Sequence, residues 1–139
     1  MTEPAFTFDH VHVVSQSPRA AADWYVRHFG AVIAADTMAR GAPQIFVTLG
    51  GVTIAIRGQR PGETPTAPPG FDDRGDYSSH GLWGVDHFGL LYDGDLAAFC
   101  GRLEADGVRL SVPLKKGVHG RTLCFVEGPD NVQIELMER

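Results

Sequence analysis

The sequence is poor in the features that mark several classes of protein. Only two of its 139 residues are cysteines, Cys100 and Cys124, and both lie in apolar segments, which argues against a disulfide-stabilised secreted scaffold. No apolar run reaches the length of a membrane span, and no signal peptide is apparent. The formal net charge is only -5, and the basic residues are scattered apart from Lys115-Lys116. We therefore expect a cytoplasmic protein with neither a nucleic-acid nor a membrane partner.

What the sequence does contain is an internal duplication. The segment VDHFGLLY at residues 85–92 resembles FDHVHVVS at residues 8–15, which lies 77 residues earlier. The same offset aligns Gly30 with Gly107. Each Asp-His strand is followed by an alanine-rich helical segment that ends at a glycine. A repeat of this kind indicates two copies of one structural unit.

Periodicity predicts the same order of elements in both copies. In the first copy, Ser17-Pro18 begins a helix and Gly30 ends it. The strands of the first copy are expected at residues 6–15, 31–36, 44–49 and 52–57. The second copy is expected to contain a strand at 82–92, a helix at 95–105 and strands at 108–113, 121–126 and 132–137. A strand, a helix and three strands, twice over, is an α+β plan.

The length of the chain fits one domain with a shared core. We expect a single domain over residues 1–139, in which modules 6–57 and 82–138 are joined by a linker at 58–81. The linker is rich in Pro and Gly and shows little periodicity. It is either a plain connector or a cover over a pocket, with Phe71 and Tyr77 as lid residues in the second case.

The duplication also indicates candidate metal ligands. His10 and His87 are equivalent at an offset of 77, and the strand of Glu135 matches that of Ala55 at an offset of 80. Strand alternation puts Glu135 on the sheet face away from the helix. If the modules close face to face, His10, His87 and Glu135 converge. Two imidazoles and one carboxylate form an open site for a divalent iron, manganese, nickel, cobalt or zinc ion. His12 shares a face with His10 and is an alternative ligand.

Three segments resemble a known superfamily. They are FDHVHV at residues 8–13, VDHFGL at 85–90 and FVEGPDNVQIEL at 125–136. Together they resemble the vicinal oxygen chelate superfamily, which includes glyoxalase I, methylmalonyl-CoA epimerase, fosfomycin-resistance thiol transferases, extradiol dioxygenases and bleomycin-binding proteins. The resemblance implies two βαβββ modules that form a cup-shaped mixed sheet around a metal site, with the helices outside. It places the metal on His10, His87 and Glu135 and implies a homodimer.

The branches of this superfamily fit the sequence unequally. Glyoxalase I has a proton-transferring carboxylate where this chain has Ala55, and the epimerases tend to carry Glu there. Extradiol dioxygenases are expected to have a Tyr where Phe125 stands. A small-molecule substrate is common to all branches, but no branch matches in every respect.

Three functions remain open at this point. The first is a metal-dependent isomerase or lyase, epimerase- or glyoxalase-like, that acts on a small oxygen-chelating substrate. The second is a non-haem iron(II) extradiol-type dioxygenase, and the third is a metal-free protein that binds an antibiotic or another small molecule. The third is disfavoured by the ligand set, and the first is our preferred hypothesis.

An isomerase or lyase needs an acid or base within reach of the reacting C–H group. His12 and His119 are the candidates, because histidine titrates near neutral pH. Three residues are expected to bind the substrate. Arg57 points inward by alternation and suits a carboxylate or phosphate, and Gln44 lies on the same mixed face. Phe125 stands where the resemblance to extradiol dioxygenases would place a tyrosine.

Overall fold

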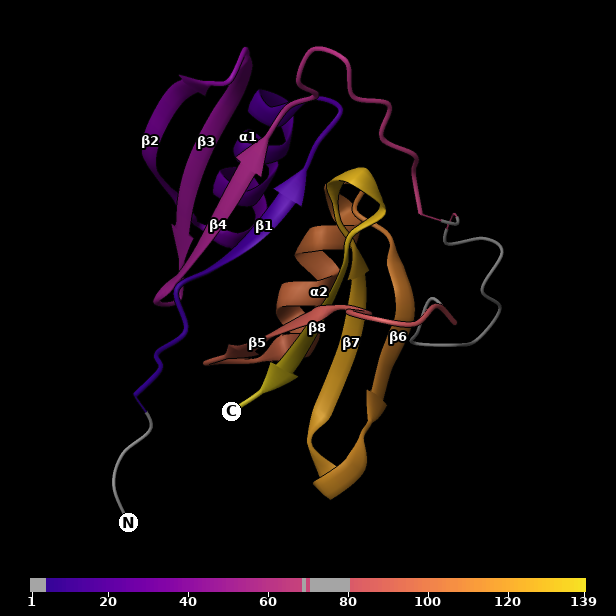
Figure 1. Ribbon diagram of the computed structural model, residues 1–139. Coiled ribbons are helices and arrows are strands. Elements are labelled where there is room, and N and C mark those ends of the chain that lie inside the picture. Colours follow the sequence, from indigo (N-terminus) through magenta and orange to yellow (C-terminus); the bar gives the residue numbers. More distant parts are fainter. Residues whose placement is uncertain (1–4, 69, 71–80) are drawn as a thin grey trace. The chain divides into compact units, whose positions relative to one another are not determined.

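The protein is described by a computed structural model, in which residues 5–68, 70 and 81–139 are placed. The chain divides into two compact units, residues 1–66 and 67–139. Each unit contains one four-stranded mixed sheet and one α-helix (Figure 1). The α+β class with two βαβββ modules is therefore confirmed. The lid residues proposed from the sequence, Phe71 and Tyr77, lie outside the described residues.

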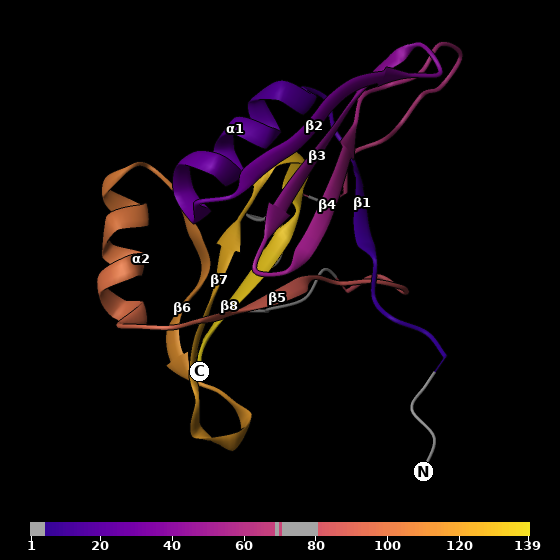
Figure 2. The same ribbon diagram turned by 90° about the vertical axis from the view of Figure 1, so that its left-hand side faces the viewer.

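Unit 1 has the strand order β1-β4-β3-β2. Its elements are β1 (His10–Val14), α1 (Pro18–Phe29), β2 (Val32–Ala39), β3 (Ala42–Leu49) and β4 (Val52–Arg57). β1 runs parallel to β4, and the other pairs are antiparallel. The predicted helix start and stop are confirmed, since Ser17 is the N-cap and Gly30 ends α1 with a φ of 71°. The buried side of α1 packs on β3 and β4 (Figure 2).

Unit 2 repeats this plan with the strand order β5-β8-β7-β6. Its elements are β5 (Phe88–Tyr92), α2 (Leu96–Ala105), β6 (Leu110–Lys116), η2 (Val118–Gly120), β7 (Thr122–Glu127), η3 (Pro129–Asn131) and β8 (Gln133–Glu138). The side chain of Asp95 caps α2 by accepting a hydrogen bond of 3.0 Å from the backbone N–H of Ala98. Neither α2 nor any other described helix is long and apolar enough to cross a membrane.

The two sheets repeat the same strand register. Val11 in β1 lies opposite Ile54 in β4, and Phe88 in β5 lies opposite Ile134 in β8. These two pairs are related by the offsets of 77 and 80 that the sequence shows. The duplication therefore extends from the sequence to the hydrogen-bonded pairing of the strands.

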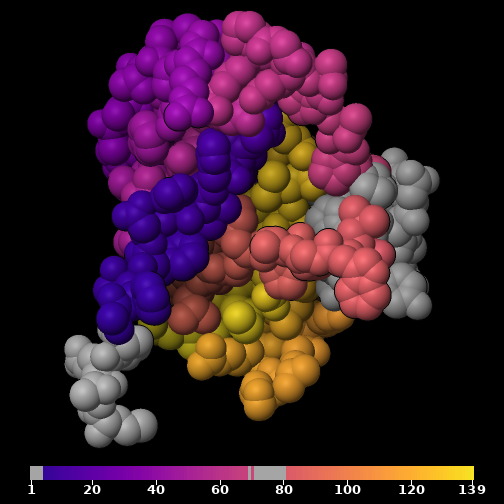
Figure 3. All heavy atoms as spheres, viewed as in Figure 1, coloured from indigo at the N-terminus to yellow at the C-terminus, as the bar shows by residue number. Residues whose placement is uncertain are grey.

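Both leading strands begin later than alternation predicted. β1 begins at His10 rather than at residue 6, and β5 begins at Phe88 rather than at residue 82. The pairing explains the difference, because His10 lies opposite Thr53, the second residue of β4, and the described residues before Asp9 extend beyond the start of β4. Residues 81–87 lie on the surface of unit 2 as the salmon segment, in which Trp83 is fully exposed (Figure 3).

Two hairpins are longer than predicted. β2 and β3 continue to a two-residue turn, Arg40-Gly41, with φ values of 51° and 83°. Positive φ at both central positions gives a turn whose twist matches that of the paired strands. β6 continues to Lys116, which pairs with Thr122, so the loop predicted at 114–120 is shorter and starts at residue 117.

Candidate metal centre

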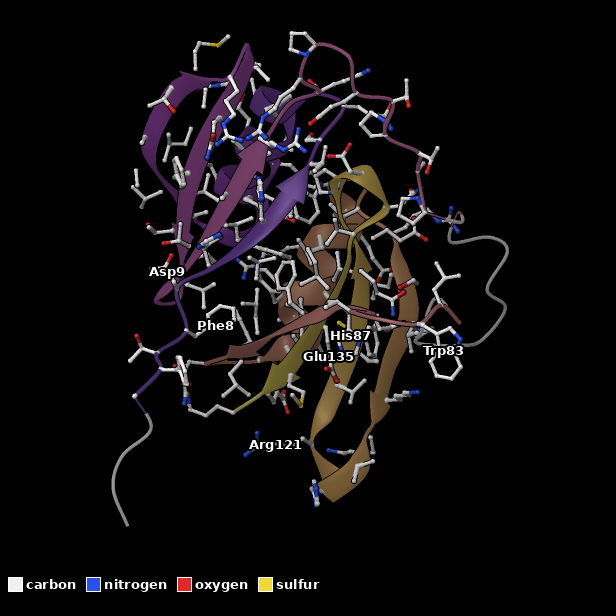
Figure 4. All side chains as sticks on the ribbon, in the orientation of Figure 1. Phe8, Asp9, Trp83, His87, Arg121 and Glu135 are labelled. Carbon is white, nitrogen blue, oxygen red and sulfur yellow. The ribbon has the colours of Figure 1, made fainter. Side chains whose placement is uncertain are left out.

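His87 and Glu135 lie side by side on one face of the sheet in unit 2 (Figure 4). His87 immediately precedes β5, and Glu135 lies in β8 opposite Gly89. The neighbours Ile134 and Leu136 are buried, so Glu135 projects to the other face. The Nε2 atom of His87 is 3.1 Å from Oε2 of Glu135, and the two side chains are 30% and 17% exposed. The structure thus brings two of the three predicted ligands together.

An aspartate orients each of the two predicted histidine ligands. Oδ2 of Asp86 is 2.7 Å from Nδ1 of His87, and Oδ2 of Asp9 is 2.6 Å from Nδ1 of His10. Because a carboxylate only accepts hydrogen bonds, each Nδ1 is the donor, and in the neutral form of the ring the lone pair is on Nε2. This arrangement is typical of metal-binding histidines. No role was predicted for these two aspartates, although the repeated Asp-His dipeptide in the sequence indicates them.

The surroundings of the pair are partly open and partly apolar. A Cβ atom at Gly89 would lie 3.4 Å from Oε2 of Glu135, so the glycine leaves room for the carboxylate. Phe125 lies opposite Glu135 in β7, and its ring packs edge-on against His87 with 5.0 Å between the centroids. Phe125 belongs to a buried cluster with Val112 and Leu123. Phe125, which was predicted to bind the substrate, therefore places an apolar ring beside His87.

The spacing and the donor types fit a divalent cation. Two donors at right angles, each about 2.1 Å from a metal, are about 3.0 Å apart. The distance of 3.1 Å between His87 and Glu135 is close to this value. A neutral His87 whose proton is on Nδ1 cannot donate a hydrogen bond from Nε2, so a cation or a second proton is needed between the two groups. Within the described residues, no third His, Cys, Asp or Glu completes a metal-binding group.

Unit 1 occupies the equivalent positions differently. Ala55 stands at the position of Glu135, and His12 lies opposite Ala55, where unit 2 has Gly89 opposite Glu135. His10 and His12 are on the same face of the sheet, with 6.3 Å between their ring centroids. Unit 1 therefore contributes two imidazoles and no carboxylate at these positions.

The environment of His12 favours its neutral form. Burial lowers the pKa of His12, and the positive charges of Arg57, His10 and Arg60 lower it further, in that order. A neutral imidazole can accept a proton or bind a metal at neutral pH.

Two of the other predicted site residues lie together in unit 1, and His119 lies in unit 2. Arg57 in β4 lies opposite Gln44 in β3, and its Nη1 is 2.6 Å from a carboxylate oxygen of Glu63. His119 lies in η2, which is exposed and precedes β7. Thr122, at the start of β7, is about 10 Å along the strand from Phe125. The structure therefore does not bring His119 to the pair beside Phe125.

The family follows from the sequence match. Residues 7–136 match the model of the Glyoxalase/Bleomycin resistance protein/Dioxygenase superfamily. The chain belongs to this superfamily. The matched range contains both Asp-His pairs and Glu135. Comparison with curated proteins gives no match.

Solved structures of other superfamily proteins have the same fold. A glyoxalase family protein from Enterococcus faecalis is 18% identical, with a TM-score of 0.74 over 95% of this chain and 97% of that chain. A glyoxylase/bleomycin resistance protein/dioxygenase domain from Frankia sp. EAN1pec is 17% identical, with a TM-score of 0.74 over 97% and 93% of the two chains.

A fosfomycin resistance protein has the same fold as well. A mutant of FosX from Listeria monocytogenes, complexed with Mn(II) and dihydroxypropylphosphonic acid, is 13% identical, with a TM-score of 0.69 over 94% of this chain and 90% of that chain. That neighbour was solved with a divalent metal bound. At these identities the likeness to this chain shows the fold alone.

Proposed function

We propose that this superfamily member is a divalent-metal-dependent isomerase or lyase that acts on a small oxygen-chelating substrate. The metal ligands in this proposal are His10, His87 and Glu135. The observation that carries it is the distance of 3.1 Å between Nε2 of His87 and Oε2 of Glu135, with Nδ1 of His87 held by Asp86. His10 supports the third position, because Asp9 holds its Nδ1 in the same way. Iron, manganese, nickel, cobalt and zinc all accept this donor set.

The residues around the pair have separate roles in this proposal. A divalent metal held by His10, His87 and Glu135 would supply a Lewis acid for the oxygens of the substrate. Asp86 and Asp9 keep the protons on Nδ1 and so direct Nε2 of each histidine. Phe125 shields one side of His87 from water. His12 takes a proton from the substrate on its ring nitrogen. We assign this role to His12 rather than to His119, because His119 lies at the far end of β7 from Phe125.

The dioxygenase alternative uses the same three ligands with iron(II). The residue packed against His87 is Phe125, which carries no hydroxyl group, and this is why we place that alternative second. The two reactions are separable with a substrate panel. Solvent deuterium incorporation into hydroxy and oxo acids reports an isomerase or lyase, whereas oxygen consumption with catechols reports a dioxygenase.

The ligand assignment is tested by metal binding. We expect protein purified without added metal to contain a divalent ion by elemental analysis, and Glu135→Ala to lower its affinity by more than about 100-fold. Glu104→Ala removes an exposed carboxylate of α2 in the same unit and should leave the affinity unchanged. Full metal occupancy in Glu135→Ala would contradict the assignment. A wild-type protein that neither contains nor takes up metal would favour the metal-free binding function.

A further inference from the structure

A tight turn follows β4 and is fixed to unit 1. In the 60–63 turn, the backbone N–H of Glu63 donates a hydrogen bond of 3.1 Å to the carbonyl of Arg60. Pro61 in the second position and Gly62, with a φ of 82°, in the third make this a type II turn. Pro61 also packs on the turn between β2 and β3, where a Cβ at Gly41 would lie 3.0 Å from the proline ring.

This turn brings the carboxylate of Glu63 onto Arg57. Oε2 of Glu63 accepts hydrogen bonds of 2.6 Å from Nη1 of Arg57 and of 3.2 Å from the backbone N–H of Arg60. The side chain of Arg57 is only 14% exposed, and that of Glu63 is 32% exposed. The hydrogen bond from Arg57, followed by that from Arg60, lowers the pKa of Glu63, so the carboxylate is ionised at neutral pH.

One carboxylate does not satisfy the two guanidinium groups. Nε of Arg57 and Nε of Arg60 are both buried, and neither has a hydrogen-bond partner within the described residues. Among the described residues, Arg57 pairs with the carboxylate of Glu63. No described carboxylate forms an ion pair with the guanidinium of Arg60. The cluster therefore has a surplus positive charge and unused N–H donors. Arginine donors of this kind suit carboxylate and phosphate-type oxyanions.

The arginine cluster lies on the sheet face that carries the histidines of unit 1. His12 lies opposite Ala55, and Arg57 is two residues further along β4, so its side chain is on the same face. Gln44, opposite Arg57 in β3, adds an amide to this face.

We propose that Arg57 and Arg60 bind an oxyanion group of the substrate and that Glu63 occupies this subsite until the substrate displaces it. The oxyanion is a carboxylate, a phosphonate or a phosphate. The identification of the anion as part of the substrate rests on the proposed function, because the proposed base His12 lies on the same face as Arg57. The 60–63 turn is then an internal competitor held by the fold.

Titration of the metal-free, full-length protein with inorganic phosphate and, separately, with acetate tests this subsite by calorimetry. Glu63→Gln keeps the shape of the side chain and removes its charge, so we expect it to bind the preferred anion about tenfold more tightly than wild type. Arg57→Gln and Arg60→Gln should each bind it at least about tenfold more weakly. Arg121→Gln removes an exposed arginine of unit 2 and should bind like wild type (Figure 4). Circular dichroism and urea denaturation check that each variant is folded.

The outcomes separate this inference from the function on which it rests. Equal affinities of wild type and Glu63→Gln would overturn the role of Glu63, and binding that survives both arginine substitutions would overturn the subsite. Failure of both wild type and Glu63→Gln to bind either anion in the millimolar range would also overturn it. No metal is present in the anion titration, so its result does not depend on the proposed metal ligands. If the anion binds as expected but Glu135→Ala still binds metal like wild type, the assignment of the metal ligands is refuted and the anion subsite is not.

Discussion

Gly89 is a position where the proposed metal site can be altered without changing a ligand. It lies in β5 opposite Glu135, and a Cβ atom there would be 3.4 Å from Oε2 and 3.8 Å from Cβ of Glu135. These are ordinary van der Waals distances, so Gly89→Ala should preserve the strand. The added methyl group fills the space beside the carboxylate and restricts the positions that Oε2 can take.

Two effects of opposite sign follow from this substitution. Alanine in a strand has less conformational freedom in the unfolded chain than glycine, so the free energy of unfolding should rise by about 0.5–1 kcal/mol. Disturbing the groups that position a metal ligand lowers metal affinity by about 10–100-fold, which is about 1.4–2.7 kcal/mol of binding free energy. Gly89→Ala is therefore expected to be more stable without metal and weaker in binding it. General damage to the fold cannot produce this combination.

Urea denaturation of the metal-free protein and calorimetric titration with Mn²⁺ measure the two effects. Gly101→Ala is the matched control, because Gly101 lies in α2 and a Cβ there would meet no atom within 4 Å. We expect this control to gain about 1 kcal/mol of stability and to bind metal like wild type. If Gly89→Ala also binds metal like wild type, Glu135 does not hold the ion from this position and the argument fails.

Two further predictions concern Asp86 and the buried thiols. Asp86→Asn should weaken metal binding by about 10–100-fold, measured in competition with a chelating dye, because asparagine no longer fixes the proton of His87 on Nδ1. Asp93→Asn changes an exposed aspartate and should bind metal like wild type. If Asp86→Asn also binds metal like wild type, Asp86 does not orient His87. Burial raises the pKa of Cys100 and of Cys124. The folded protein therefore keeps protons that the unfolded chain loses, and the free energy of unfolding should fall above about pH 8.5, by up to about 1.4 kcal/mol per pH unit for each thiol. Urea denaturation across this pH range should show the free energy of unfolding falling with pH in wild type. The fall should disappear when both cysteines are replaced by alanine. If that variant shows the same fall, groups other than the thiols cause it.

Local signals in the sequence predicted the order of the elements but not the ends of all strands. The cap at Ser17 and the stop at Gly30 depend on neighbouring residues, and the structure confirms both. The start of β1 depends instead on where β4 can pair with it. In the same way β6 runs to Lys116 because Thr122 lies opposite. Strand length is set by a distant partner, which alternation in one segment does not reveal.

In the candidate site too, some features were predicted from the sequence and others depend on contacts between distant residues. The duplication predicted His87 and Glu135 as ligands, and the pairing of β5 with β8 places them side by side. The contact between Glu63 and Arg57 was not predicted, because Glu63 lies in a Pro- and Gly-rich segment without periodicity. Its carboxylate reaches Arg57 only through the 60–63 turn and the packing of Pro61, which are tertiary features.

The two units carry their large polar group on different strands at equivalent positions of their sheet faces. In unit 2, the long side chain of Glu135 lies opposite Gly89, whereas in unit 1 the large ring of His12 lies opposite Ala55. Opposite residues in a sheet have Cβ atoms about 5 Å apart, so each of these pairs forms one local patch of the sheet face. Each unit has one large polar group in this patch, on β8 in unit 2 and on β1 in unit 1. The carboxylate in unit 2 is the proposed metal ligand Glu135, and the imidazole in unit 1 is the proposed base His12. The two units therefore supply different groups at equivalent positions.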